Sequence, residues 1–344
     1  MKKERARVLV LHVGGTIGMV QGHEGFGPSA GFLAAYLASM PELLRADMPA
    51  CTLEVLDPLL DSADMMPDDW VRIARVIAAR HDAYDGFVVV HGTDTLAYTA
   101  SALSFLLPGL ARPVILTGAQ LSLTDPRSDG REHLVTAILL AGTERVPEVC
   151  IYFAQRLLRG NRAQKVHNDR FAAFDSGNFP ALAHAGSLIE VRHTLVLAPG
   201  HGLSPRIELP RRPEVAALRI FPGIQARMIE KVVEPPLEGL VLETYGAGNA
   251  PARDEALLEV LRRATARGVV VVNCSQCHGG RVRQGLYQTG SALARSGVVS
   301  GHDMTPEAAL TKLYCLLASG LDPATVRTQM EQDLAGELTP PSRP

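Results

Sequence analysis

Short apolar runs alternate with helix-like patterns along most of the chain. Residues 8–13 and 87–90 are apolar and rich in β-branched side chains, and each run leads to a glycine-containing polar turn, as buried strands do. The same alternation predicts strands at 51–56, 113–117, 148–153, 215–221, 239–244 and 268–274, and helices at 32–44, 68–80, 96–107, about 130 to 141, 224–232, 254–267, 306–319 and 323–334. Alternating strands and helices favour parallel pairing with right-handed crossovers, so the predicted fold class is α/β.

The alternation stops between about residues 191 and 213, where prolines are frequent and no periodicity is visible. At 344 residues the chain also exceeds the usual size of one domain. We therefore predict an N-terminal domain at residues 1–190, a linker at 191–213 and a C-terminal domain at 214–344. Each domain is predicted to be a three-layer α/β arrangement with a mostly parallel sheet.

Charge and cysteine content restrict the class of protein. Charged residues make up 20% of the chain and the formal net charge is −2, so no basic surface for nucleic acid is expected. The apolar run at 8–13 is too short for a signal-peptide core or a membrane span. Five scattered cysteines, an odd number, argue against a disulfide framework and for a reducing compartment. We therefore expect a cytoplasmic protein that binds neither nucleic acid nor membrane.

Two polar turns follow predicted strands. Thr93, Asp94 and Thr95 come after the strand at 87–90, and all three residue types suit a helix N-cap, which is the simplest interpretation. However, open α/β sheets bind ligands at the carboxyl ends of their strands. Thr16 follows the first strand in a turn with two glycines. If the two strands are parallel in one sheet, these side chains converge.

A threonine hydroxyl is a weak nucleophile and needs a base or a proton relay. Lys165, in the basic loop at 156–165, is the candidate base, with Thr93 as relay and Asp94 as orienting charge. A carboxylate raises the pKa of a neighbouring lysine whereas burial lowers it, and the sequence leaves this balance open. Each residue also has a simpler interpretation: Thr16 as a turn residue, Asp94 as an N-cap and Lys165 as a solvated charge.

Two further loops stand out. Residues 20–28 are glycine-rich and lack periodicity, which predicts a mobile loop that could cover a site. Residues 57–67 form a polar, proline-bounded loop that contains Asp61 and Ser62. These two residues are either turn-formers or ligands.

The turns after both strands resemble the motifs of a known family. The letters HVGGTIG at residues 12–18 and HGTDT at residues 91–95 are similar to the two signature motifs of bacterial-type L-asparaginases. Supporting matches extend over nearly the whole chain, at residues 61–65, 117–120, 127–130, 159–162 with Lys165, 245–249 and 336–339. The closest resemblance is to the cytoplasmic type I enzymes.

This resemblance implies hydrolysis of L-asparagine to L-aspartate and ammonia through an acyl-enzyme, with no metal or other cofactor, in a homodimer or homotetramer. Thr16 would be the nucleophile, with Thr93, Asp94 and Lys165 as the relay. The resemblance also implies that Asp61 and Ser62 hold the α-amino and α-carboxyl groups of the substrate, and that Gly92 and Ala119 line its site. A zwitterionic substrate needs an acceptor for its ammonium group and a donor for its carboxylate, and an aspartate beside a serine supplies both.

The chain departs from the family pattern at three places. Phe26 stands where many bacterial members have a loop tyrosine that helps to activate the nucleophile. Glu243 replaces an arginine of the asparagine effector site found in some type I enzymes, and residues 163–164 replace a threonine pair near it, although Asn249, Asn273 and Cys277 match. We therefore predict hyperbolic kinetics.

The cysteines near residue 275, His91 and the function each have an alternative interpretation. Cys274, Cys277 and His278 could suggest a metal site, but zinc needs about four ligands and no second pair has suitable spacing. Buried or subunit-contact thiols are therefore favoured, and His91 is interpreted as a packed, hydrogen-bonded residue. The alternative functions are a broader glutaminase or amidase, including one that supplies ammonia to an amidotransferase, and an asparagine-binding protein that has lost turnover.

Overall fold

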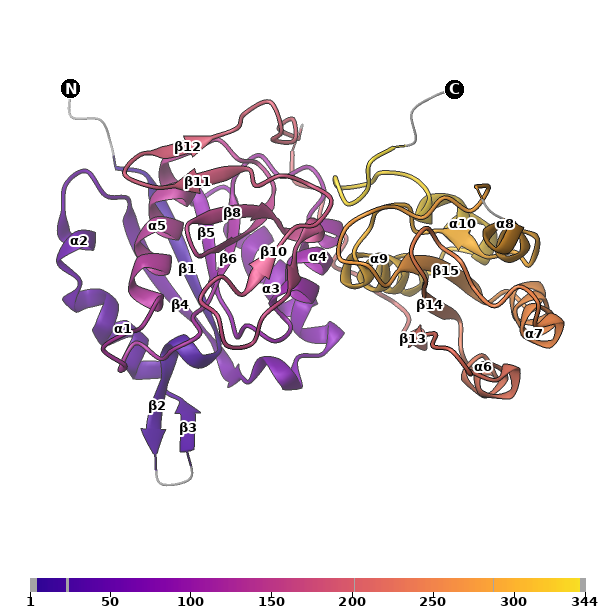
Figure 1. Cartoon of the computed structure of the whole chain (residues 1–344). Coiled ribbons are helices and arrows are strands. Elements are labelled where there is room, and N and C mark those ends of the chain that lie inside the picture. Colours follow the sequence, from indigo (N-terminus) through magenta and orange to yellow (C-terminus); the bar gives the residue numbers. More distant parts are fainter. Residues whose placement is uncertain (1–4, 23–24, 201, 287, 341–344) are drawn as a thin grey trace. The chain divides into compact units, whose positions relative to one another are not determined.

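A computed structural model of the protein describes residues 5–22, 25–200, 202–286 and 288–340 (Figure 1). The chain divides into two compact units. The first comprises the residues up to Asp175 together with Pro180–Ile207, and the second comprises Ser176–Phe179 together with the residues from Glu208 onward. The predicted linker at 191–213 spans the passage between Ile207 and Glu208. No helix in the described part of the chain is both long and apolar enough to cross a bilayer.

The first unit is built on an eight-stranded mixed sheet with the order β12-β11-β8-β7-β6-β5-β1-β4. Five neighbouring strands are parallel: β4 (Ala50–Leu60), β1 (Arg7–Gly14), β5 (Gly86–Val90), β6 (Val114–Thr117) and β7 (Val149–Phe153). Three antiparallel strands complete one edge: β8 (Arg156–Arg159), β11 (Ala183–Ala185) and β12 (Ile189–Val191). The strands β5, β6 and β7 are buried on both sides, which explains their continuous apolar runs.

The helices of the first unit are α1 (Ala30–Ser39), α2 (Pro41–Leu44), α3 (Pro67–Arg80), α4 (Leu96–Leu106) and α5 (Gly130–Thr143). Figure 1 shows α5 on one face of the sheet and α3 with α4 on the other. The connections through α4 and α5 advance across the sheet in the same direction, so they have opposite hands. The prediction of right-handed crossovers is therefore wrong for one of them. The long polar segment before α5 carries the chain to the other face.

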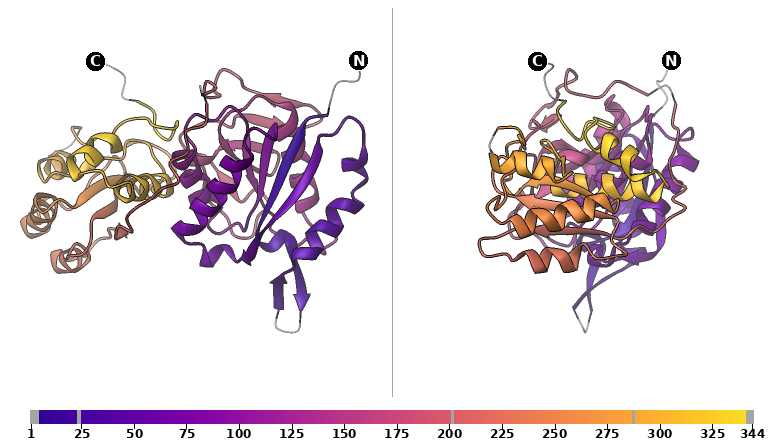
Figure 2. Two further views of the ribbon diagram at one scale, coloured as in Figure 1. Left: turned by 180° about the vertical axis from the view of Figure 1, so that it is seen from behind. Right: turned by 90° about the vertical axis from the view of Figure 1, so that its right-hand side faces the viewer.

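The second unit has a parallel four-stranded sheet with the order β13 (Val215–Arg219), β14 (Gly239–Thr244), β15 (Val270–Ser275) and β16 (Val299–Ser300). Its helices are α6 (Ala226–Val232), α7 (Glu255–Ala266), α8 (Gln288–Arg295), α9 (Pro306–Ala318) and α10 (Pro323–Met330). Leu240 and Leu242 of β14 pack into a core with α6, α7 and α8, whereas Val241 packs into a second core with α9 and α10. The alternation of strand side chains thus creates a core on each side of the sheet. Figure 2 shows the helices of this unit around its sheet.

The structure corrects several predicted elements. Within residues 20–28, predicted as a mobile loop, the described residues belong to two antiparallel strands, β2 (Met19–Gly22) and β3 (Gly25–Pro28). The backbone of Phe26 pairs with Gln21, but its side chain, like residues 23 and 24, lies outside the described part. The helix predicted at 32–44 is divided before Pro41, because a proline disfavours the helical conformation of the preceding residue.

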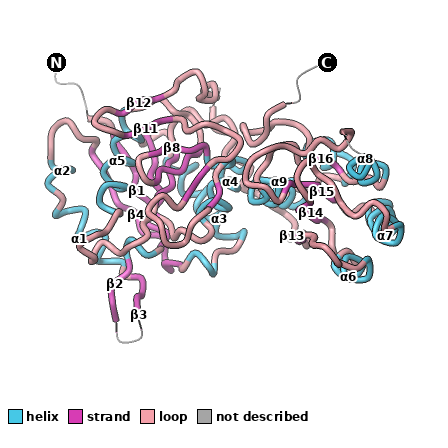
Figure 3. The backbone as a smooth tube through the Cα atoms, viewed as in Figure 1, coloured by secondary structure: helices cyan, strands magenta, loops and turns pink. Residues whose placement is uncertain are grey.

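The loops predicted at 57–67 and 156–165 also contain strands. β4 continues to Leu60, where it pairs with Gly14 after an irregularity in the register of β1. The basic segment contains β8, a short turn at Gly160–Arg162 and β9 (Gln164–Lys165), which pairs with β10 (Phe174–Asp175). Small elements such as α8 and β16 were not predicted at all. Figure 3 shows the loops that separate these elements, including those between β12 and β13, where the described residues form no helix or strand.

Candidate active site

The carboxyl ends of the central strands are level with one another. His12 of β1 pairs with Val90 of β5, and Val90 pairs with Thr117 of β6, while Gly14 pairs with Leu60 of β4. The segments that follow these strands carry Thr16, the turn at residues 91–95, the segment at 118–121 and the turn at 61–64. Parallel pairing in this register therefore places all four segments at one edge of the sheet.

Glycines allow three of these segments to touch through their backbones. A Cβ atom on Gly15, whose φ is +90°, would lie 2.4 Å from the backbone nitrogen of Gly92. A Cβ on Gly92 would lie 2.4 Å from Ser62 Oγ, and one on Gly14 would lie 1.9 Å from the carbonyl oxygen of Leu60. Real side-chain carbons do not fit at such distances. The two glycine-containing motifs thus bring the Thr16 turn, the Thr93 turn and the Ser62 turn into direct contact.

Thr16 opens a short 3₁₀ turn, Thr16–Gly18, that follows directly from Gly15. The residue is half-buried. The carbonyl of Ile17 accepts a hydrogen bond from the backbone of Leu123, and the carbonyl of Met19 accepts one from the Ser122 hydroxyl at 2.6 Å. The turn is therefore fixed from the β6–α5 connection as well as from β1.

Lys165, Thr93 and Asp94 form a hydrogen-bonded cluster. Lys165 Nζ donates to Thr93 Oγ1 at 2.8 Å and lies 2.6 Å from Asp94 Oδ1. The side chain of Lys165 is 19% exposed and that of Asp94 is 63% exposed, while Thr93 is buried. The structure thus brings together three residues that are distant in sequence and that the sequence singled out as a proton relay.

The interpretation of residues 93–95 as helix N-cap residues does not account for the hydrogen bond that the Thr95 side chain makes. Thr95 is the N-cap of α4, yet no side-chain capping hydrogen bond is present there. The Thr95 hydroxyl instead donates to the backbone carbonyl of Ser62 at 2.7 Å. The polar side chains of this turn therefore link neighbouring segments of the site.

Asp61 and Ser62 lie at the end of β4 with different environments. Asp61 is exposed, and its carboxylate accepts a hydrogen bond from the backbone of Ala63 at 3.0 Å, so it does form a turn. Ser62 is buried, with its hydroxyl against Gly92. The turn-forming role leaves the Asp61 carboxylate accessible at the same edge as Thr16 and Lys165.

Ala119 lies in the segment after β6, and it is buried. The preceding Gly118 packs so closely that a Cβ atom there would lie 2.4 Å from the carbonyl oxygen of His91 and 3.5 Å from Thr93 Cγ2. The segment at 118–121 therefore borders the Thr93 turn directly.

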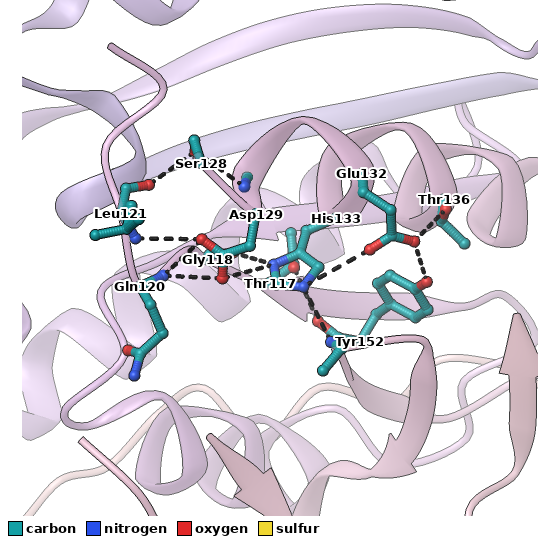
Figure 4. Close-up of polar contacts among 12 residues, drawn as sticks. Thr117, Gly118, Gln120, Leu121, Ser128, Asp129, Glu132, His133, Thr136 and Tyr152 are labelled. Atoms are coloured by element: carbon teal, nitrogen blue, oxygen red, sulfur yellow. Dashed lines mark hydrogen bonds and ion pairs between the residues drawn. The ribbon is translucent and has the colours of Figure 1, made fainter. Parts of the chain in front are cut away.

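Asp129, the N-cap of α5, and His133 of α5 form hydrogen bonds to this segment, and these contacts were not predicted from the sequence (Figure 4). Asp129 accepts backbone hydrogen bonds from Gln120 at 3.1 Å and from Leu121 at 3.2 Å. His133 bonds to the Gly118 carbonyl at 2.8 Å. The family resemblance at residues 127–130 drew attention to this region. The spacing of its polar residues does not show that Asp129 and His133 both bond to the segment at 118–121.

Two buried histidines follow or end the central strands. His91 bonds to the Gly92 carbonyl at 2.7 Å and to the Thr99 hydroxyl at 2.9 Å, as its interpretation as a packed, hydrogen-bonded residue predicts. Burial lowers the pKa of His91 to about 4, against the smaller opposing effect of the Gly92 bond. Burial also lowers the pKa of His12 to about 4, and neither of its ring nitrogens has a hydrogen-bond partner among the described residues.

Possible metal ligands do not cluster in the described part of the chain. All five cysteines are free thiols. Cys274 is buried and Cys277 is exposed, so the two cysteines of the C-x-x-C sequence have different environments.

Two family models together match most of the chain. A family model for the N-terminal part of asparaginases matches residues 7–197, and a model for glutaminase/asparaginase C-terminal domains matches residues 214–330. The chain belongs to the asparaginase family. The resemblance to L-asparaginases and the mixed α/β fold class, with mostly parallel strands, are thereby confirmed.

Individual members of the asparaginase family are similar over the full length. L-asparaginase 1 of Escherichia coli (strain K12) is 47% identical over 338 residues, which are 98% of this chain and 99% of that protein. The crystal structure of L-asparaginase I from Vibrio cholerae has a TM-score of 0.90 and 45% identity, covering 98% of this chain and 100% of that chain. The human 60 kDa lysophospholipase is 43% identical over 98% of this chain but only 62% of its own length.

Proposed function

We propose that this protein is an L-asparaginase, which hydrolyses L-asparagine to L-aspartate and ammonia through a threonine acyl-enzyme. Membership of the asparaginase family and full-length similarity to L-asparaginase 1 of Escherichia coli support the reaction. The single observation that carries the proposal is the cluster in which Lys165 Nζ contacts both Thr93 Oγ1 and Asp94 Oδ1.

In this proposal, Thr16 Oγ attacks the side-chain amide carbon of asparagine. In this step Lys165 acts as the neutral amine: it takes the Thr16 proton through Thr93 and passes it to the leaving nitrogen, so that ammonia departs and an aspartyl ester remains on Thr16. Water then attacks the ester, and the same groups return the proton to Thr16 as aspartate leaves. Asp94 orients Lys165, and the backbone N–H of Thr93 is the proposed donor to the oxyanion.

Binding of the substrate is assigned to the neighbouring turns. The exposed Asp61 carboxylate would accept the α-ammonium group, and the Ser62 hydroxyl would donate to the α-carboxylate. Gly92 and Ala119 would line the site beside the reacting amide. The contact of Gly92 with both Gly15 and Ser62 supports a compact site of this kind.

The subunit arrangement and location are also proposals. The N-terminal domain at residues 1–190 would carry the catalytic groups, and the C-terminal domain at 214–344 would contribute to the interface of a homodimer or homotetramer. Five free thiols support a cytoplasmic location, because disulfides are rare in reducing compartments. Light scattering of the purified protein would give the number of subunits.

A broader glutaminase activity is the second candidate, because the family model of the C-terminal half covers glutaminases as well as asparaginases. Asparagine and glutamine differ by one methylene group, which is worth only about 1 to 3 kcal/mol of discrimination in a pocket. The ratio of kcat/KM for the two amides separates the candidates.

The experiment is ammonia release from L-asparagine and L-glutamine by the wild-type protein and by Thr16→Ala, with Thr328→Ala, at an exposed threonine of α10, as the matched control. Turnover of asparagine by the wild type and Thr328→Ala, and its loss in Thr16→Ala, are expected. Thermal stabilisation by asparagine without ammonia release would instead indicate a binding protein.

A further inference from the structure

His133 is a fully buried histidine of α5 that uses both ring nitrogens (Figure 4). Nδ1 lies 2.8 Å from the carbonyl oxygen of Gly118, and Nε2 lies 3.0 Å from the backbone nitrogen of Ala154. Its ring packs against Phe153 with a centroid separation of 4.3 Å. The side chain therefore bridges the segment after β6 and the turn after β7.

These two partners determine the tautomer of His133. A backbone N–H can only donate, so Nε2 must accept from Ala154 and carries no proton. Nδ1 must then hold the proton and donate it to the Gly118 carbonyl. The carboxylates of Asp129 and Glu132 each lie 3.7 Å from one ring nitrogen, too far for a hydrogen bond. The His133 ring therefore has a donor end at Nδ1 and an acceptor end at Nε2.

The donor end of His133 fixes a particular peptide group. The Gly118 carbonyl and the Ala119 N–H belong to one planar trans unit and point in opposite directions. Holding the carbonyl on His133 thus sets the direction of the Ala119 N–H. This peptide lies against His91 and Thr93, and the next two N–H groups are held by Asp129. If this peptide group rotated, the Ala119 N–H would point in another direction and the segment beside Thr93 would change its shape.

We propose that His133 is a positioning residue for the reaction, and that it acts through the hydrogen bond from Nδ1 to the Gly118 carbonyl. The inference rests on the proposed function, since it assumes that Ala119 lines the substrate site. It assigns to the residue a task beyond core packing: it keeps the peptide between Gly118 and Ala119 oriented toward the reacting amide.

Two substitutions separate the donor end from the acceptor end. In His133→Asn, the amide nitrogen occupies the place of Nδ1 and still donates to Gly118, but Ala154 loses its acceptor. In His133→Gln, the amide oxygen reaches the place of Nε2 and accepts from Ala154, but Gly118 loses its donor. Each variant keeps one of the two hydrogen bonds, so similar losses of thermal stability are expected.

The proposal predicts different kinetics for the two variants. His133→Gln should lose between about tenfold and a hundredfold in kcat for asparagine, as small misplacements at a reacting centre do, whereas His133→Asn should stay within about threefold of wild type. Thr136→Val is the control, because Thr136 contacts Glu132 in the same network without touching the segment at 118–121. Its kcat should equal that of wild type.

If His133→Asn and His133→Gln lost kcat equally, in step with their loss of stability, the positioning role would be overturned. His133 would then contribute only to the packing of the core. A larger loss in His133→Asn would overturn it as well. If wild-type protein itself released no ammonia from asparagine, the proposed function would fail. That outcome is distinct from one in which wild type is active and the two variants behave alike.

Discussion

Lys165 is the residue on which the proposed relay depends. Its side-chain nitrogen contacts both Thr93 and Asp94, so a methionine at this position would keep the length of the side chain and remove the group that carries the proton. We expect Lys165→Met to lower kcat by about 10²- to 10⁴-fold, the usual contribution of general acid–base catalysis.

The matched control for this variant is Lys231→Met, since Lys231 is an exposed lysine of α6. Both variants are compared by steady-state ammonia release from asparagine. Near-normal turnover by Lys165→Met would show that the relay uses another base.

The buried histidines predict how stability depends on pH. His12 and His91 have pKa values of about 4 in the folded protein, against about 6.5 for an unfolded histidine. The unfolded chain therefore binds protons first, so each histidine lowers the free energy of unfolding as the pH falls from about 6.5 towards 4. At about pH 5 the loss is about 2 kcal/mol per histidine relative to neutral pH.

Urea unfolding of wild type and His12→Leu at about pH 7.5 and about pH 5 tests this prediction. His12→Leu should lose less stability than wild type between the two pH values, because one of the two groups is gone. An unchanged pH dependence would contradict the assignment of His12 as a neutral buried residue.

At the residue scale, the sequence singled out Thr93 and Asp94 because they follow a buried strand, and Lys165 because it is a candidate base in the basic loop at 156–165. It could not show that they touch, since the distance between Thr93 and Lys165 in the chain is bridged only by the fold. His133 and Asp129 were missed as functional candidates because a buried polar residue on a helix gives no sign of its partner.

The elements around the site depend on glycines in strained positions. A side chain at Gly15 would meet the backbone of Gly92 and would have to adopt a φ of +90°. Gly15→Ala should therefore separate the Thr16 and Thr93 turns, with a loss of stability of about 1–3 kcal/mol and loss of ammonia release.

Gly31→Ala in the exposed first turn of α1 is the control for Gly15→Ala, since nothing lies within 4 Å of a Cβ atom there. It should stabilise the protein slightly, by up to about 1 kcal/mol, because alanine is the better helix former. Full activity of Gly15→Ala would show that contact between the two turns is not required.

At the element scale, long apolar strands and periodic helices such as α7 and α9 were predicted nearly to the residue. The hairpin of β2 and β3 was missed because glycines obscure the alternation of a strand. The continuation of β4 to Leu60 was missed because a proline such as Pro58 is uncommon inside a strand and is more typical of a loop. The opposite hand of one crossover was missed because periodicity does not show which face of a sheet a helix covers.

At the scale of the whole molecule, the second unit bears on regulation. The resemblance to type I enzymes implies that Glu243 stands where some of them have an effector-site arginine. Glu243 lies 3.3 Å from Arg219 in an ion pair. An ion-paired carboxylate at this position offers no free donor to the carboxylate of an effector. We therefore expect hyperbolic dependence of the rate on asparagine concentration, with a Hill coefficient of about 1.

Initial rates over a wide range of asparagine concentrations test this expectation, and Glu243→Arg provides the comparison. A Hill coefficient clearly above one in the wild-type protein would contradict it.

The sequence indicated a passage between two α/β domains, but each unit builds its own cores, so the pattern of apolar residues contains no information on how subunits associate.

In the proposed mechanism Thr16, and not Thr93, carries the acyl group. The most direct test is to mix the protein with excess L-asparagine, quench with acid during turnover, digest the chain and locate the aspartyl ester by mass spectrometry. We expect an adduct on the peptide that contains Thr16 and none in Thr16→Ala. An adduct on the peptide that contains Thr93 would contradict this mechanism, because Thr93 would then be the nucleophile and not the relay.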